Sequence, residues 1–168
     1  EAFLWYGVLQ TRAGDIPIRD FQSYDPGRYY WCVAWSFLFG EGILGLRASL
    51  AVMQGIGVFL GLRVCRRATE SRAALAISAA VLASWMFPMH KIFEPTIAMA
   101  AVLVVIRLLE VPSSRRMLEA GALVGLAGWL GRNHGLYSGL ALGSIVGLLL
   151  WAGRLQSPRR ALTSFVLG

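Results

Sequence analysis

Apolar runs that alternate with short arginine clusters constrain the fold of this chain more than any other feature. Hydrophobic residues make up 57% of the chain and charged residues only 15%, whereas a soluble domain usually has roughly 25% charged residues. Long apolar runs with few charges are typical of helices that cross a membrane. We therefore predict an all-α fold, a polytopic transmembrane helix bundle. The spans are expected at about residues 48–62, 73–87, 96–109, 117–130 and 135–151.

The arginine clusters predict the orientation of this bundle. They follow the first, third and fifth expected spans, and such clusters usually face the cytoplasm. The opening loop and the junctions at residues 88–91 and 131–134 then lie on the extracytoplasmic side of the cytoplasmic membrane. Cys32 and Cys65 fall on opposite sides, so we expect no disulfide between them. The clusters also account for the net charge of +7, so we do not expect nucleic-acid binding.

The whole chain, residues 1–168, reads as one domain in two parts. Residues 1–44 are expected to form an extracytoplasmic loop with interfacial helices. Residues 45–168 are expected to hold about five transmembrane helices and the start of another. Because the chain begins with Glu1 instead of Met and ends within an apolar segment, we expect a fragment of a longer protein.

Two short helices are predicted within the opening loop. Residues 1–12 have helical apolar spacing but are too short to span, which favours a helix lying at the membrane surface. Asp25 and Pro26 predict the start of the second helix, because Asp favours the N-cap position and Pro the first helical position. This helix is expected to end at Gly40.

The loop between these helices contains two candidate catalytic carboxylates, Asp20 and Asp25. A pair of carboxylates near a membrane surface can supply a general base, a metal ligand or a substrate anchor. The structural alternative is that Asp25 caps its helix and that Asp20 forms a salt bridge with Arg19 or Arg28. Spacing alone leaves both interpretations open.

Two further polar clusters interrupt the apolar runs on the same side, His90-Lys91 and Arg132-Asn133-His134. Fixed cations at a membrane surface can clamp a phosphate group. For Lys91, the alternative is a side chain that extends along the helix to the headgroup region. The second cluster occupies a very short turn between apolar helices, where three polar residues are costly. Neither cluster has the spacing of a typical metal site, so the need for a metal is left open.

Several short motifs occur in an order that resembles the first external loop of GT-C glycosyltransferases. The similarity is greatest to the protein-mannosyltransferase-like and aminoarabinose-transferase-like enzymes. A later helix is similar too, with an Ala-Gly…Gly-Leu-Ala…Arg…Gly pattern over residues 120–135. The loop motifs are Glu1-Ala2, Gly14-x-x-Pro17-x-Arg19-Asp20-Phe21, Asp25-Pro26-Gly27-Arg28-Tyr29-Tyr30, Phe39-Gly40 and Leu46-Arg47.

This resemblance implies transfer of a sugar from a polyprenyl-phosphate donor to a lipid, glycan or protein acceptor on the extracytoplasmic side. In the family, an acidic residue at the start of the first external loop acts as base, and basic residues near the outer surface hold the lipid phosphate. Glu1 matches the second acidic residue of the opening motif, and the first would precede it. The base is therefore left open among Glu1, Asp20 and Asp25. The expected substrate-binding residues are Arg19, Arg28, Tyr29, His90, Lys91, Arg132, Asn133 and His134.

Two other functions are compatible with the same pattern. A flippase or other transporter of lipid-linked sugars would need polar groups near the membrane midplane, and the expected spans contain few. A non-catalytic membrane subunit would not need acidic and cationic clusters on one side. No cofactor is implied with certainty, and a divalent metal ion is left open.

Overall fold

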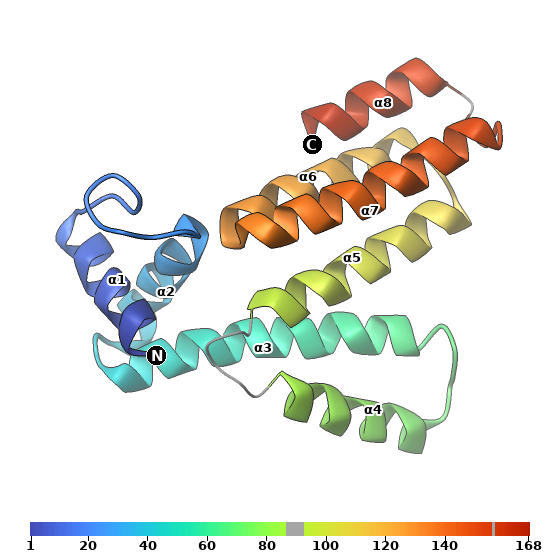
Figure 1. Ribbon diagram of the computed structural model, residues 1–168. Helices are drawn as coiled ribbons and strands as arrows, with labels where there is room; N and C mark the ends of the chain where they lie inside the picture. Colours follow the sequence, from blue (N-terminus) through green and yellow to red (C-terminus); the bar gives the residue numbers. More distant parts are fainter. Residues whose placement is uncertain (87–92, 156) are drawn as a thin grey trace.

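A computed structural model describes residues 1–86, 93–155 and 157–168, and these form eight helices and no strand (Figure 1). The prediction of an all-α fold is therefore confirmed. Within the described residues, every segment predicted as a span forms a helix, and the expected boundaries agree with the observed ones to within a few residues. The helices are α1 (Ala2–Ala13), α2 (Pro26–Phe39), α3 (Ile43–Cys65), α4 (Arg72–Trp85), α5 (Phe93–Glu110), α6 (Ser114–Leu130), α7 (Arg132–Trp151) and α8 (Pro158–Leu167).

The helix ends follow local sequence signals. Gly14 ends α1 in the left-handed conformation, with φ 105°, and Pro26 occupies the first turn of α2. Ser71 and Ser113 cap α4 and α6, because their side-chain oxygens accept hydrogen bonds from Ala74 N and Arg116 N at 3.3 and 3.4 Å.

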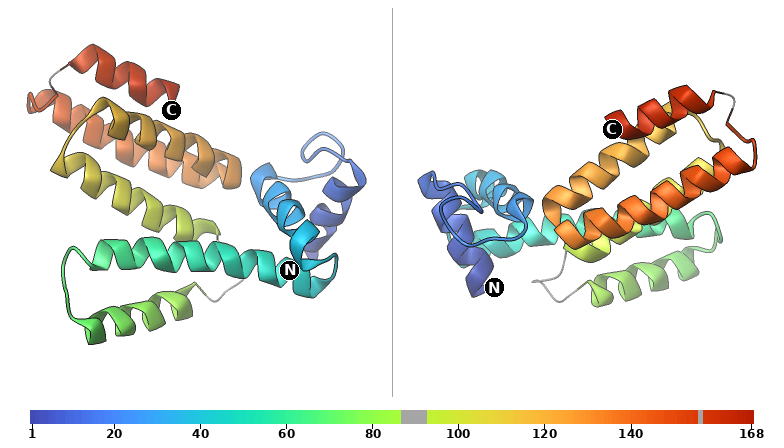
Figure 2. Two further views of the ribbon diagram at one scale, coloured as in Figure 1. Left: turned by 180° about the vertical axis from the view of Figure 1, so that it is seen from behind. Right: turned by 45° about the horizontal axis from the view of Figure 1, so that its top comes forward.

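The helices α1 and α2 form a small unit at the start of α3, and the other helices extend away from it (Figures 1 and 2). Along the bundle, α3 packs on α5, α6 packs on α7, and α8 lies on α6. A buried cluster that includes Tyr29, Leu50 and Phe93 joins the small unit to α3 and α5. A second cluster, around Leu108 and Leu142, closes the far part of the bundle.

Alternating helix directions give the bundle two different ends. We call the end with α1, α2 and the starts of α5 and α7 the loop end, and the opposite end the basic end. The basic end holds ten of the sixteen basic residues of the chain and three of its nine acidic residues. These are Arg63, Arg66, Arg67, Arg72, Arg107, Arg115, Arg116, Arg154, Arg159 and Arg160, with Glu70, Glu110 and Glu119.

The surface of the bundle is strongly apolar. In α4, an apolar helix of 14 residues, none of the residues is buried, and Ile77 and Val81 are more than 60% exposed. Among the described residues, two helices, α3 and α7, are long and apolar enough to cross a membrane, and about a third of each is buried. The helix α5 has 18 residues but carries three charges, and α6 has 17 residues. The structure thus supports helices at all five expected positions, whereas only two of them meet the length and composition expected of a span.

Candidate functional site

A polar cavity of about 350 Å³ lies at the loop end, where the start of α2 meets the start of α5 and the turn between α6 and α7. Segments more than 100 residues apart in sequence meet there. The lining residues are Tyr24, Asp25, Arg28, Glu94, Gly131, Arg132, Asn133 and His134. The sequence predicted that Asp20 or Asp25 lies on the same side as the Arg132-Asn133-His134 cluster, and the structure brings Asp25, but not Asp20, together with this cluster in one cavity.

Arg28 is the structural centre of this cavity. Its Nη2 lies 3.1 Å from Asp25 Oδ2 and 3.0 Å from Glu94 Oε1, and its Nε donates a hydrogen bond of 2.7 Å to the carbonyl oxygen of Leu130. The guanidinium carbon also lies 5.5 Å from the centre of the Phe93 ring. One side chain therefore connects α2 with the start of α5 and the end of α6. Arg28 was predicted to bind substrate. In the structure its guanidinium already pairs with two carboxylates of the protein, those of Asp25 and Glu94.

Asp25 caps a helix other than its own. It occupies the N-cap position of α2 without forming a side-chain cap there. Its Oδ1 instead accepts a hydrogen bond of 2.9 Å from the backbone N–H of Arg132, the first residue of α7. This contact satisfies an N–H that has no partner within α7 and fixes the start of α7 against the loop. The carboxylate remains on the cavity wall.

Arg132 brings an available cation to the cavity. Its guanidinium lies 5.4 Å from the centre of the Tyr24 ring, a cation–π contact. Among the described residues, no carboxylate forms an ion pair with this guanidinium. His134 stands beside it, edge-on to Tyr137 with 6.1 Å between ring centres. An anion entering the cavity would therefore meet Arg132 without first displacing an internal carboxylate.

A smaller cavity of about 160 Å³ adjoins the first and shares Tyr24, Asp25 and Arg28 with it. Its remaining walls are largely apolar. They are formed by Glu1, Phe3, Leu4, Tyr29 and Phe93. The combined space therefore has a polar part that contains Arg132 and a largely apolar part beside α1.

Close contacts between helices hold this arrangement together. A Cβ atom added to Gly27 would lie 2.7 Å from the Trp129 ring, so only glycine lets α2 lie this near the end of α6. Tyr30, one turn further along α2, stacks on Trp129 with 6.1 Å between ring centres. These contacts place Arg28 beside the carbonyl oxygen of Leu130.

The other loop carboxylate, Asp20, has a different role and does not line either cavity. Its Oδ1 accepts a hydrogen bond of 2.8 Å from Arg19 Nε, and its Oδ2 accepts one of 2.7 Å from the backbone N–H of Ile16. These contacts, chiefly that with Arg19, lower the pKa of Asp20 to about 2. A carboxylate with so low a pKa is a weak base at neutral pH. The structural alternative, a salt bridge between Asp20 and Arg19, is observed.

The remaining candidate residues are distributed around the second cavity or outside the described residues. Glu1 lines the second cavity and pairs with Arg47 at 2.9 Å. Tyr29 is buried, and burial is the main cause that raises its pKa. The predictions for His90 and Lys91 concern residues outside the described ranges.

Glu94 lines the cavity but was not among the site residues predicted from the sequence. Its Oε1 pairs with Arg28, and its Oε2 is buried with no hydrogen-bond partner among the described residues. The available signal was a carboxylate at the start of an apolar helix, where an unpaired charge is costly and a cationic partner is expected.

Among residues 1–86, 93–155 and 157–168, no group of three or more His, Cys, Asp or Glu side chains could hold a metal ion. No protein-family model, curated protein or solved structure matches this chain.

Proposed function

We propose that this chain is part of a GT-C-type membrane glycosyltransferase. It would transfer a sugar from a polyprenyl-phosphate donor to a lipid, glycan or protein acceptor on the extracytoplasmic side of the cytoplasmic membrane. One observation carries this proposal: the cavity with Asp25, Glu94 and Arg132 adjoins a cavity with largely apolar walls. A lipid-linked sugar phosphate has the same division into a charged group and an apolar chain.

The apolar surface supports a membrane setting. A helix such as α4, which is apolar but has no buried residue, would be costly in water and is suited to lipid. The concentration of arginine at the basic end favours a cytoplasmic location for that end. The candidate site, at the loop end, would then face outward.

The proposed reaction is a direct displacement at the anomeric carbon of the donor. The acceptor hydroxyl oxygen forms a bond to this carbon, and the bond from the carbon to the phosphate oxygen breaks. A cavity carboxylate takes the hydroxyl proton, and the lipid phosphate leaves with the bonding electrons. Asp25 is the favoured base among the sequence candidates, because it lines the polar cavity, whereas Asp20 lies outside both cavities and Glu1 lines only the largely apolar one.

Arg132 would bind the leaving phosphate. Negative charge on the phosphate grows as the bond breaks, so a cation fixed beside it stabilises the transition state more than the bound donor. His134 and the side-chain amide of Asn133 can donate further hydrogen bonds in the same cavity. Arg28 would hold the carboxylates of Asp25 and Glu94 in position.

The test is transfer from a polyprenyl-phosphate sugar by membranes that contain the full-length protein at matched levels. Asp25→Asn should lower the rate by about 10²–10⁴-fold through loss of the base. Arg132→Gln should lower it by about 10²–10³-fold through loss of a stabilising charge. The matched controls, Asp15→Asn and Arg12→Gln, change the same charges outside both cavities and should transfer at near wild-type rates.

Two results would contradict the proposal. Near wild-type transfer by both cavity variants would exclude this cavity as the site. Loss of transfer in Asp20→Asn with normal transfer in Asp25→Asn would identify Asp20, outside both cavities, as the base.

A further inference from the structure

Another cavity, of about 350 Å³, lies at the basic end, far from the candidate site. It forms where the connection between α5 and α6 meets the connection between α7 and α8. The lining residues are Val111, Pro112, Ser113, Ser114, Leu155, Ser157, Arg160 and Ala161. The proposed sugar transfer uses none of these residues.

The chemistry of this lining suits a phosphate group attached to an apolar body. Arg160 provides a positive charge, and Ser114 and Ser157 provide exposed hydroxyl groups that can donate hydrogen bonds. Leu155 and Ala161, both buried, form an apolar part of the wall. A wall of this composition binds a charged headgroup better than it binds a purely apolar ligand.

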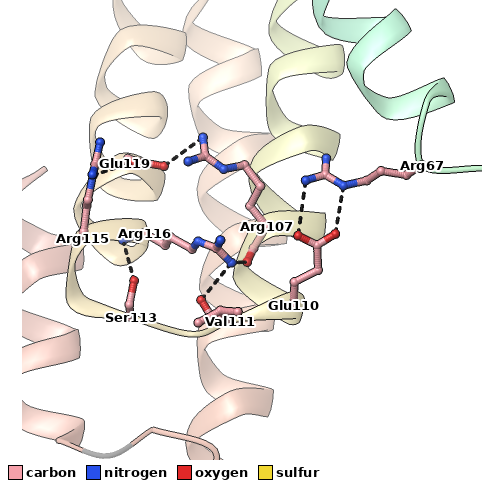
Figure 3. Close-up of polar contacts among 8 residues, drawn as sticks. All are labelled: Arg67, Arg107, Glu110, Val111, Ser113, Arg115, Arg116 and Glu119. Atoms are coloured by element: carbon pink, nitrogen blue, oxygen red, sulfur yellow. Dashed lines mark hydrogen bonds and ion pairs between the residues drawn. The ribbon is translucent and has the colours of Figure 1, made fainter.

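Two of the three acidic residues of the basic end pair with arginines outside this cavity, and the third, Glu70, does not line it. Figure 3 shows Glu110 paired with Arg67, and Glu119 paired with Arg107 and Arg115, so both carboxylates are occupied by other arginines. Three arginines flank or line the cavity without a carboxylate partner among the described residues. They are Arg154, Arg159 and Arg160.

We propose that this cavity binds the phosphate headgroup of an anionic phospholipid from the cytoplasmic leaflet. Free phosphate shares the same chemistry. The lipid is favoured because apolar side chains of the cavity wall reach the surface: Val111 is 56% exposed and Pro112 is partly exposed. These side chains would meet acyl chains while Arg160 meets the headgroup. The inference rests on the membrane setting of the proposed function but is independent of sugar transfer.

The experiment is a titration of the purified full-length protein in detergent, followed by native mass spectrometry. Phosphatidylglycerol is compared with phosphatidylcholine. The wild-type protein should retain phosphatidylglycerol preferentially. Arg160→Gln should weaken this binding about fivefold, the effect of one arginine near an anionic lipid. Arg159→Gln removes the same charge from the neighbouring position of α8 but does not line the cavity, so it should weaken phosphatidylglycerol binding clearly less than Arg160→Gln does.

A second variant separates loss of binding from loss of folding. Ser114→Asp introduces a carboxylate into the cavity, at a position in the first turn of α6 where Asp favours the helix. This variant should keep the thermal stability of the wild-type protein and lose phosphatidylglycerol binding.

Several outcomes would overturn the inference. Equal weakening in Arg159→Gln and Arg160→Gln would indicate diffuse charge attraction instead of a site. Equal retention of phosphatidylglycerol and phosphatidylcholine would exclude recognition of the anionic headgroup. Displacement of the lipid by an equimolar concentration of inorganic phosphate would identify free phosphate as the ligand. Normal lipid binding together with inactive sugar transfer would leave this inference standing and count against the proposed function alone.

Discussion

At the scale of single residues, two carboxylates only five positions apart have different environments. Asp25 lies on the wall of the polar cavity and receives the first N–H of α7. Asp20 lies outside the cavity and closes the loop through Arg19 and the N–H of Ile16. Their distance along the sequence could not separate these roles, because the partner that defines Asp25 is 107 residues away.

The role of Asp20 predicts how the loop responds to pH. The pKa of Asp20 is lowered to about 2, so the charged form stabilises the folded loop. This contribution is present at neutral pH, above the ordinary pKa of 3.8, and is lost as the pH falls from about 4 through about 2. Hydrogen exchange of the Ile16 amide, corrected for the intrinsic rate, should therefore show protection at neutral pH that disappears in acid.

The same amide can be examined at neutral pH in two variants. Asp20→Asn should speed exchange at Ile16, because the carboxylate that accepts its N–H is replaced by a weaker acceptor. Asp15→Asn removes the same charge from the same loop and should leave exchange at the wild-type rate. Identical exchange in the two variants would show that Asp20 does not hold the loop.

At the scale of helices, the turn between α6 and α7 determines where Arg132 lies. The two helices approach closely at Gly128 and Gly135, and a Cβ added to Gly135 would overlap the backbone of Gly128. Gly143, two turns further along α7, has no atom within 4 Å of an added Cβ among the described residues. Glycine recurs at every fourth position of the chain from Gly131 to Gly147, and this repeat contributes to close packing at Gly135 but faces open space at Gly143 and Gly147.

This difference predicts opposite effects of the same substitution along α7. Gly135→Leu should destabilise the protein by about 1–3 kcal/mol, because the neighbouring backbone cannot move aside as a side chain would. Gly143→Leu should be neutral or slightly stabilising, because leucine favours a helix more than glycine does. Thermal unfolding of the detergent-solubilised variants measures both effects. A melting temperature lowered equally in both would contradict the contact between Gly128 and Gly135.

The elements of this fold were more predictable than its contacts. Apolar periodicity, together with signals such as Pro26 and Gly40, indicated every helix that the described residues form. Helix lengths were less accurate, because α3 continues through Arg47 and Arg63, which a search for apolar runs excludes. The pairing of Arg28 with Glu94 could not be predicted, since it depends on how two distant helices meet.

At the scale of the whole molecule, the distribution of charge is the feature that relates fold to function. The basic end carries a large excess of arginine, whereas acidic and basic residues are nearly equal in number at the loop end. A chain with this asymmetry and an apolar middle should adopt one orientation in a membrane. Cys32 and Cys65 lie towards different ends, but Cys32 is only 1% exposed, and burial raises its pKa to about 11. The native cysteines are therefore poorly suited to testing orientation by labelling.

Two exposed positions provide a better test of orientation. Gln22→Cys lies in the loop beside the candidate site, and Glu70→Cys lies between α3 and α4 at the basic end. Both are placed in full-length protein that carries Cys65→Ser, so that buried Cys32 is the remaining native cysteine of this chain. A membrane-impermeant maleimide should label Gln22→Cys in intact cells. It should label Glu70→Cys only after the membrane is permeabilised, because arginine clusters are retained in the cytoplasm. The unsubstituted background serves as the control for labelling of Cys32.

Labelling of Glu70→Cys alone in intact cells would reverse the orientation and place the cavity around Asp25 on the cytoplasmic side. Labelling of both positions would show that the two ends do not lie on opposite sides of a membrane.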